Sequence, residues 1–339
     1  MNRILLSTTI ALAAATPLAM HGADSSEENP NRLSLGPRFG MNFKGSFHNS
    51  APVNPGPAAG GANHNYNDGY VRLDSSGNAG GLTSNWGYQN GSQVVGDTMQ
   101  FNAVQSSGSA GSADSKVTGD PQYGAELTYQ RVLGHLPFAS AGRWGLEGAF
   151  GYTDLDLRDN HSMTGPVTVT TDAYQLNGVI PPGAGYNGTF QGPGALLGDV
   201  PTRTTTTEIA TLTSHQKLSG QLYSIRLGPF AEWNFTDELS LAVSVGLTLA
   251  PASVKYDFSE TVTGASGTFA ASGHSSKTEL LYGPYVSAML RYDFSKSWGV
   301  YIGAQFQSLN DLELSAGNRT ARLDQSATIY GLVGASWRF

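Results

Sequence analysis

Residues 327–339, Ala-Thr-Ile-Tyr-Gly-Leu-Val-Gly-Ala-Ser-Trp-Arg-Phe, decide how this chain folds. Successive side chains of a β-strand point to opposite faces, so a strand with one apolar face carries apolar residues at every second position. The apolar face here holds Ile329, Val333, Ala335, Trp337 and Phe339. This stretch is therefore predicted to be a strand that ends at the last residue and exposes one apolar face.

Seven other segments alternate in the same way. They span residues 33–44, 123–130, 144–153, 223–235, 239–249, 279–294 and 298–307. The alternation is cleanest between Leu239 and Leu249, where Leu and Val alternate with Ser, Ala, Gly and Thr. Eight such segments predict an all-β chain, but a soluble β-sandwich would show the same alternation.

The lengths of the connections favour a membrane barrel. Short connections follow the second, fourth and sixth segments, whereas long ones follow the first, third and fifth. The two longest are expected to be extracellular loops at residues 48–119 and 159–217. Short periplasmic turns and long outer loops are typical of outer-membrane barrels.

The aromatic residues favour the same interpretation. If the short turns are periplasmic, four of the five tryptophans fall at the periplasmic ends of strands and face outward, as the headgroup level of a membrane favours. The predicted periplasmic girdle comprises Trp144, Trp233, Phe235, Phe294, Trp298, Trp337 and Phe339. The opposite girdle would comprise Phe43, Tyr152, Tyr223, Tyr282 and Phe306.

The other face of the segments carries charges of both signs. These predicted interior residues are Arg38, Lys44, Glu126, Glu147, Arg226, Glu232, Glu279, Arg291, Asp293 and Arg338. Ten charges in a sandwich core would be costly to desolvate, whereas a barrel lumen lets them pair with each other and with water. We therefore predict a transmembrane antiparallel up-and-down β-barrel of eight strands, its last strand closing against its first. A hairpin within residues 48–119 could raise the number to ten.

The N-terminus and the composition complete this organisation. Residues 1–23 have the charged start, apolar centre and small residues of a signal peptide, residues 24–32 would be a short periplasmic segment, and residues 33–339 the barrel. The chain has no cysteine, so disulfides and a lipid-modified cysteine are excluded. Without the signal its net charge is about −8, which argues against a nucleic-acid partner.

The final strand resembles the C-terminal signature of outer-membrane barrels, in which a terminal Phe and alternate apolar residues are read by the barrel-assembly machinery. Eight strands with four outer loops are similar to the OmpA, OmpX and OmpW type of barrel in the porin-like superfamily. The resemblance implies the outer membrane of a Gram-negative bacterium, with outer-membrane lipids and the assembly machinery as partners. It implies no particular activity.

An eight-stranded barrel is narrow enough to be filled by its own side chains. We therefore expect a monomeric, non-enzymatic barrel with a structural or surface-interaction role, in which the long loops could bind an extracellular ligand. A narrow porin is the alternative, and a lipid A-modifying enzyme a distant one. Its candidates would be His274 and Ser276, with Glu260 as the acid, although His48 and Ser50 share the same spacing and His161 with Asp159 offers no better arrangement. Asp68, Asp74 and Asn78 could ligate calcium, but their spacing matches no EF-hand, and no catalytic, cofactor or metal site is predicted.

Overall fold

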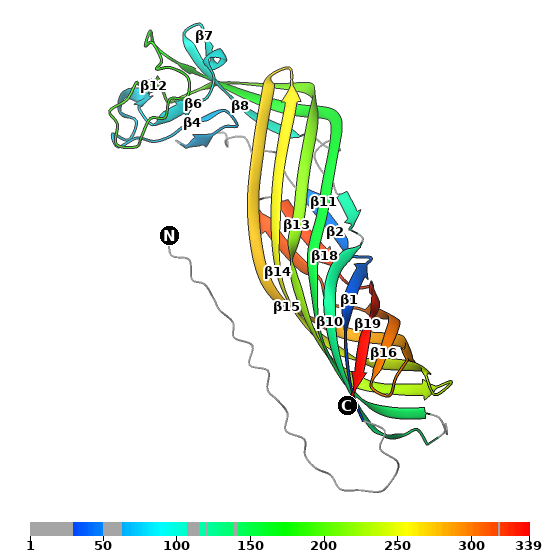
Figure 1. Cartoon of the computed structure of the whole chain (residues 1–339). Coiled ribbons are helices and arrows are strands. Elements are labelled where there is room, and N and C mark those ends of the chain that lie inside the picture. Colours follow the sequence, from blue (N-terminus) through cyan, green and yellow to red (C-terminus); the bar gives the residue numbers. More distant parts are fainter. Residues whose placement is uncertain (1–29, 50–62, 107–114, 120, 138–141, 318) are drawn as a thin grey trace.

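A ring of eight antiparallel strands forms the lower part of the molecule (Figure 1). The computed structural model describes residues 30–49, 63–106, 115–119, 121–137, 142–317 and 319–339, so the predicted signal peptide lies outside the described residues. The ring consists of β1 (Asn31–Met41), β10 (Gln122–His135), β11 (Gly142–Gln175), β13 (Thr202–Asn234), β14 (Leu239–Gly264), β15 (Gly267–Asp293), β16 (Trp298–Gln307) and β19 (Thr328–Arg338). Among the described residues, no helix is long and apolar enough to cross a membrane.

The ring closes as the sequence predicts. β19 pairs with β1, with Trp337 opposite Leu33, and the pairing of β10 with β11 completes the circle. The prediction of eight strands is confirmed, and the alternative of ten is wrong. β7 (Val94–Val95) and β8 (Thr98–Ser106) do join the same sheet, but β8 pairs with β11 only at Val167–Gln175, far beyond the ring, and β7 pairs with β8.

Four of the strands are much longer than the sequence suggested. β11, β13, β14 and β15 continue past the ring as a curved four-stranded sheet, here called the stalk (Figure 1). The predicted loop 159–217 is therefore wrong in extent, since only residues 176–201 separate β11 from β13. The Thr-rich stretches at the two ends of this predicted loop resemble loop sequence because their exposed face is polar. Thr is β-branched and favours strands, however, and Val167 and Val169 alternate toward a buried face.

A second sheet covers the inner face of the stalk directly above the ring. It contains β17 (Leu312–Ala316), β18 (Arg319–Asp324), β2 (Lys44–Asn49) and β9 (Ser115–Thr118), in that order. Its apolar residues share one core with the stalk and with the upper barrel wall. This core, the plug core, includes Phe43, Phe47, Leu155, Leu157, Leu218, Tyr256, Leu312, Leu314, Leu323 and Tyr330.

A small head lies at the far end of the stalk (Figure 1). It contains β3 (His64–Asn65), β4 (Gly69–Val71), β5 (Leu82–Thr83), β6 (Trp86–Tyr88), β12 (Leu197–Gly198), β7, β8 and two 3-10 turns at Ala79–Gly81 and Gly91–Gln93. Trp86 is fully buried at its centre and packs against Tyr88 and Tyr186. The predicted loop 48–119 is thus folded over much of its length, because its aromatic side chains supply a core of their own.

Candidate functional site

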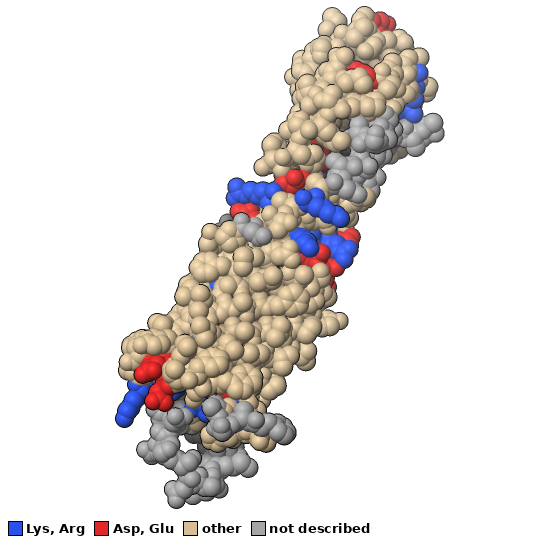
Figure 2. Space-filling model, turned by 90° about the vertical axis from the view of Figure 1, so that its right-hand side faces the viewer, with Lys and Arg blue, Asp and Glu red and all other residues tan. Residues whose placement is uncertain are grey.

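The outer surface of the ring is a broad belt of exposed apolar side chains. Exposed apolar residues of the belt include Leu35, Leu146, Ile225, Leu227, Val245, Leu247, Leu290, Ile302 and Val333. On the face shown in Figure 2, charged side chains gather at the lower end and at the waist, with few between them. A contiguous apolar surface of this size is foreign to soluble monomers and is what the hydrocarbon of a membrane requires.

Aromatic residues lie at both edges of this belt. Trp144, Trp233, Trp298 and Trp337 all lie within three residues of a strand end, on the side of the short β13–β14 and β15–β16 turns. The ten-residue step from Trp233 to Tyr223 on β13 spans about 33 Å of strand, or about 25 Å across a membrane once the strand is tilted.

At the predicted lower girdle, Phe235, Phe294 and Phe339 are exposed as well. At the upper edge Tyr152 and Tyr223 pack together, with ring centroids 5.4 Å apart. Phe43 was expected in this upper girdle but is fully buried in the plug core, because the chain turns inward at Asn42, which has φ 63°.

The interior of the ring is filled by charged side chains that bond across it. In an upper layer Glu126 accepts from Arg38 at 3.3 Å and from Arg226 at 2.5 Å, and Arg226 lies 3.5 Å from Glu147. Arg38 also stacks on Tyr330, its guanidinium carbon 3.6 Å from the ring centroid. Each of these charged side chains is at most 2% exposed, so the layer leaves no wide opening among the described residues.

A lower layer is centred on Glu232 and Arg291. Glu232 lies within 3.6 Å of guanidinium nitrogens of Arg32, Arg143 and Arg291. Arg291 donates at 2.5 Å to Gln130, which is on the opposite wall of the ring. Arg32 also lies 3.0 Å from Asp293, which in turn lies 2.7 Å from the partly exposed Arg338, so the two carboxylates belong to one network.

Two predicted interior charges are placed elsewhere, and two were missed. Lys44 is exposed on β2, after the chain has left the ring, and Glu279 is partly exposed on the stalk, where it pairs with Lys277 at 2.8 Å. Arg32 and Arg143 lie in the interior but outside the predicted segments. Each is one residue before its segment and in phase with its polar face, so extending the alternation by one position would have found both.

The plug core closes the upper mouth of the ring. Tyr330 and Leu332 of β19 and Met289 of β15 belong to the same buried cluster as Phe43 and Leu312. A polar ion-pair layer is therefore capped by an apolar layer. An ion following the barrel axis would have to cross both.

The residues considered for catalysis and for calcium are not assembled into sites. His274 and Ser276 are exposed on β15, whereas Glu260 is buried and bonds to Arg319, so Glu260 cannot orient His274. Asp74 accepts from Ser76 and Ser84, and these hydrogen bonds hold the pKa of Asp74 well below its ordinary value. No group of three or more His, Asp or Glu that could hold a metal occurs within the described part of the chain.

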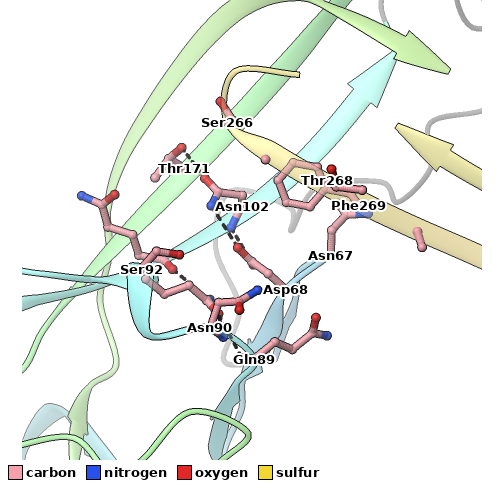
Figure 3. A pocket seen from close by; sticks show the side chains of 14 residues that line it. Asn67, Asp68, Gln89, Asn90, Ser92, Asn102, Thr171, Ser266, Thr268 and Phe269 are labelled. Atoms are coloured by element: carbon pink, nitrogen blue, oxygen red, sulfur yellow. Dashed lines mark hydrogen bonds between the residues drawn. The ribbon is translucent and has the colours of Figure 1, made fainter. Parts of the chain in front are cut away.

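A polar pocket of about 600 Å³ lies between the head and the tip of the β14–β15 hairpin (Figure 3). Its described lining comprises Asn67, Asp68, Gln89, Asn90, Ser92, Gln93, Gln100, Asn102, Thr171, Ser266, Gly267, Thr268, Phe269 and Ala270. Burial raises the pKa of the Asp68 carboxyl, although hydrogen bonds from Asn102 oppose the effect. The sequence offered no motif for this pocket, because its walls come from five separate stretches of chain.

Comparisons with known proteins give distant likenesses. No protein-family model and no curated protein match the chain. Among solved structures it is similar to the outer membrane protein OprG from Pseudomonas aeruginosa (10% identity, TM-score 0.31, 91% of this chain and 95% of that chain). It is also similar to the outer membrane protease OmpT from Escherichia coli (10% identity, TM-score 0.27, 93% of this chain and 99% of that chain). A third similar structure is that of Ail, the attachment invasion locus protein of Yersinia pestis (10% identity, TM-score 0.25, 90% of this chain and 99% of that chain).

These likenesses are too distant to transfer a role to this chain. Its own geometry is more direct: the ring of eight strands is closed, its outer surface is apolar between aromatic edges, and its polar residues face inward. The chain is an eight-stranded β-barrel protein of the bacterial outer membrane.

Proposed function

We propose that this protein is a non-enzymatic surface-recognition barrel, in which the ring anchors the chain and the head binds a partner outside the cell. The observation that carries the proposal is the position of the head. From Tyr223 at the upper edge of the belt to Thr202 at the head, β13 runs without interruption for about 70 Å of strand. A barrel whose only task was to span the membrane would gain nothing from this extension.

The stalk is built to keep the head at a distance. β11 and β13 remain paired from Gly142↔Trp233 to Ala173↔Thr202, so each strand braces the other over its whole length. The plug core stiffens the lower half, and Arg319 of β18 bonds to Glu260 of β14 above it. A stiff support limits the ordering cost when the head meets its partner.

The head has the features of a folded binding module. Tyr66 and Phe101 stack at a centroid distance of 5.1 Å, and Trp86 Nε1 donates to the Ala195 carbonyl at 2.7 Å. These contacts join residues 63–106 to residues 176–201 in one core. As further parts of the proposal, the protein would act as a monomer and contact outer-membrane lipids through its belt. The assembly machinery would recognise its last strand.

Adhesion of cells that display the full chain tests the proposal. Cells would be presented with immobilised mucin, extracellular-matrix proteins and bacterial surface polysaccharide, and compared with cells that display Trp86→Ala. Removing Trp86 unpacks the head and leaves the ring intact, which heat-modifiable migration in gels verifies. We expect adhesion to at least one surface and its loss in Trp86→Ala. Adhesion to none of them, or equal adhesion by both proteins, would overturn the proposal.

A further inference from the structure

The pocket of Figure 3 is a built cavity with walls from two parts of the molecule. The head contributes the stretches around Asp68 and Gln89–Gln93 together with β8, and the hairpin tip contributes Ser266–Ala270. Its volume of about 600 Å³ lies within the range of small-molecule sites. A ligand here would contact the head and the stalk at once.

One wall is held in place by a hydrogen-bond network. Both carboxylate oxygens of Asp68 accept from Asn102, at 2.8 Å from its backbone N–H and at 2.9 Å from its side-chain amide. The Thr171 hydroxyl donates to the Asn102 amide oxygen at 2.7 Å, and Figure 3 shows these side chains turned toward one another. The wall is therefore positioned before any ligand arrives, which lowers the entropic cost of binding.

Three other polar side chains at the pocket take no part in the described hydrogen bonds that hold the fold together. The side chains of Gln89, Ser92 and Gln100 have no hydrogen-bond partner among the described residues. An amide offers two donors and an acceptor, and a hydroxyl can donate or accept. This surface therefore presents donors and acceptors together, as a ligand rich in hydroxyl groups requires.

The composition of the walls selects the class of ligand. Eleven of the fourteen described lining residues have polar side chains, which disfavours a lipid or another apolar ligand. None of the fourteen is Lys, Arg or His, so a phosphate, sulfate or acidic sugar would find no counter-charge there. Asp68 is the single carboxylate, which is too few for a bound divalent cation.

We infer that this pocket binds a neutral carbohydrate, a sugar unit read by the amide and hydroxyl groups of its walls. Phe269 borders the pocket from the hairpin, but it is only 6% exposed and packs in a buried apolar cluster with Val104 and Val169, so the polar groups provide the surface on which the sugar would lie (Figure 3). The inference rests on the proposed function and names the partner of the head. Such sugars occur both on host oligosaccharides and on bacterial surface polysaccharide.

The experiment measures binding by the refolded full chain in detergent micelles. An array of neutral oligosaccharides, their sialylated and sulfated counterparts, and purified neutral O-polysaccharide would be probed in parallel. The test variants are Gln89→Ala with Gln100→Ala, which removes two free amides, and Gln100→Trp, which adds bulk on the face of β8 that also carries Asn102. Gln191→Ala is the matched control, because Gln191 is an exposed glutamine of the head outside the pocket.

We expect a neutral glycan to bind, with affinity lowered about tenfold or more in both pocket variants and unchanged in Gln191→Ala. Comparing binding to the neutral oligosaccharides with binding to the O-polysaccharide then shows whether the sugar comes from host glycans or from bacterial surface polysaccharide. Binding of acidic glycans only, or neutral binding that both pocket variants retain, would overturn the inference. If Trp86→Ala abolishes adhesion while the pocket variants adhere normally, the proposed function stands and only the sugar pocket is wrong.

Discussion

Glu126 shows what a single residue does inside this barrel. It accepts from Arg38 of the adjacent β1, from Arg226 of β13, two strands away on the other side, and from the Thr128 hydroxyl at 3.2 Å. All three charged side chains are at most 2% exposed. Removing one member of such a cluster leaves the others buried without compensation, which costs more than the pairs contribute.

Glu126→Ala is therefore expected to destabilise the barrel by about 3–5 kcal/mol. Urea-dependent unfolding from lipid vesicles, followed by heat-modifiable migration, measures the change. Asp156→Ala is the control, because the Asp156–Arg158 pair is exposed on the stalk. It should leave the midpoint unchanged. Equal effects of the two substitutions would contradict the buried network.

Asp172 has a comparable role at the junction of stalk and head. Its side chain is fully buried, and it accepts from Arg203 twice, both at 2.7 Å, and from Tyr66 at 2.7 Å. Burial alone would raise the pKa of Asp172, but the hydrogen bonds of Arg203 and Tyr66 outweigh it and hold the pKa below its ordinary value of 3.8. The charged form is therefore favoured in the folded head.

This lowered pKa predicts an acid-sensitive head. A carboxyl whose pKa is depressed by folding stabilises the fold above its unfolded pKa, and this contribution is lost as pH falls through the folded pKa. Head stability should be constant from pH 7 to about 5 and fall below about pH 4. The stability of the head at each pH can be measured by urea unfolding followed through Trp86 fluorescence, in a chain whose other four tryptophans are replaced by Phe. In Asp172→Asn the head should be weaker at pH 7 and approach wild type in acid. If the difference in head stability between wild type and Asp172→Asn were the same at every pH, Asp172 would not be the group responsible for the acid sensitivity.

At the scale of one element, β14 passes from membrane to water. Leu247 is 67% exposed within the belt, whereas Ser259 is exposed on the same face of the same strand, twelve residues further toward the head. The backbone and pairing are alike at the two positions, with β13 on one side and β15 on the other. Only the surrounding medium distinguishes them.

Replacing each of these two residues by arginine should therefore show which part of β14 lies in the membrane. Leu247→Arg is expected to cost about 2–4 kcal/mol, because a charge near the bilayer midplane loses its hydration. Ser259→Arg should leave stability unchanged. Unfolding from vesicles in urea measures both, and the wild-type chain is the common reference. If Ser259→Arg were as costly, the belt would have to extend up the stalk.

The same scale shows where elements could be predicted and where they could not. In the ring, one face meets lipid, so apolar and polar residues alternate sharply and all eight strands are recognisable. On the stalk, water covers the outer face, and rows such as Thr164, Thr211, Thr263 and Thr268 resemble loop composition. β17 and β18 carry alternating Leu and Ala, but their five and six residues are too short to distinguish from loop.

At the scale of the whole molecule, two kinds of layer, one ion-paired and one apolar, lie across the axis of the barrel. The ion-pair layers bond opposite walls, and the plug core covers them with aromatic and aliphatic side chains. An ion entering the plug core would lose its hydration without gaining partners. Closure at two levels favours an anchor over a pore.

We therefore expect no steady current from the refolded full chain in a planar lipid bilayer. A reconstituted porin in the same lipid serves as the positive control for insertion and detection. Protease protection of the ring in matched vesicles verifies that the chain has inserted. A stepwise, ion-selective current from the wild-type chain would instead support the narrow-porin alternative.

The sequence by itself determined the class of fold, the number of strands in the ring, the closure of the last strand on the first and most of the interior charges. Each follows from a local alternation that the contrast between lipid and lumen imposes on every strand. The stalk, the plug core, the head and its pocket were decided by tertiary structure. Their residues are brought together from distant stretches such as Asp68, Thr171 and Phe269, and no local pattern records which stretches will meet.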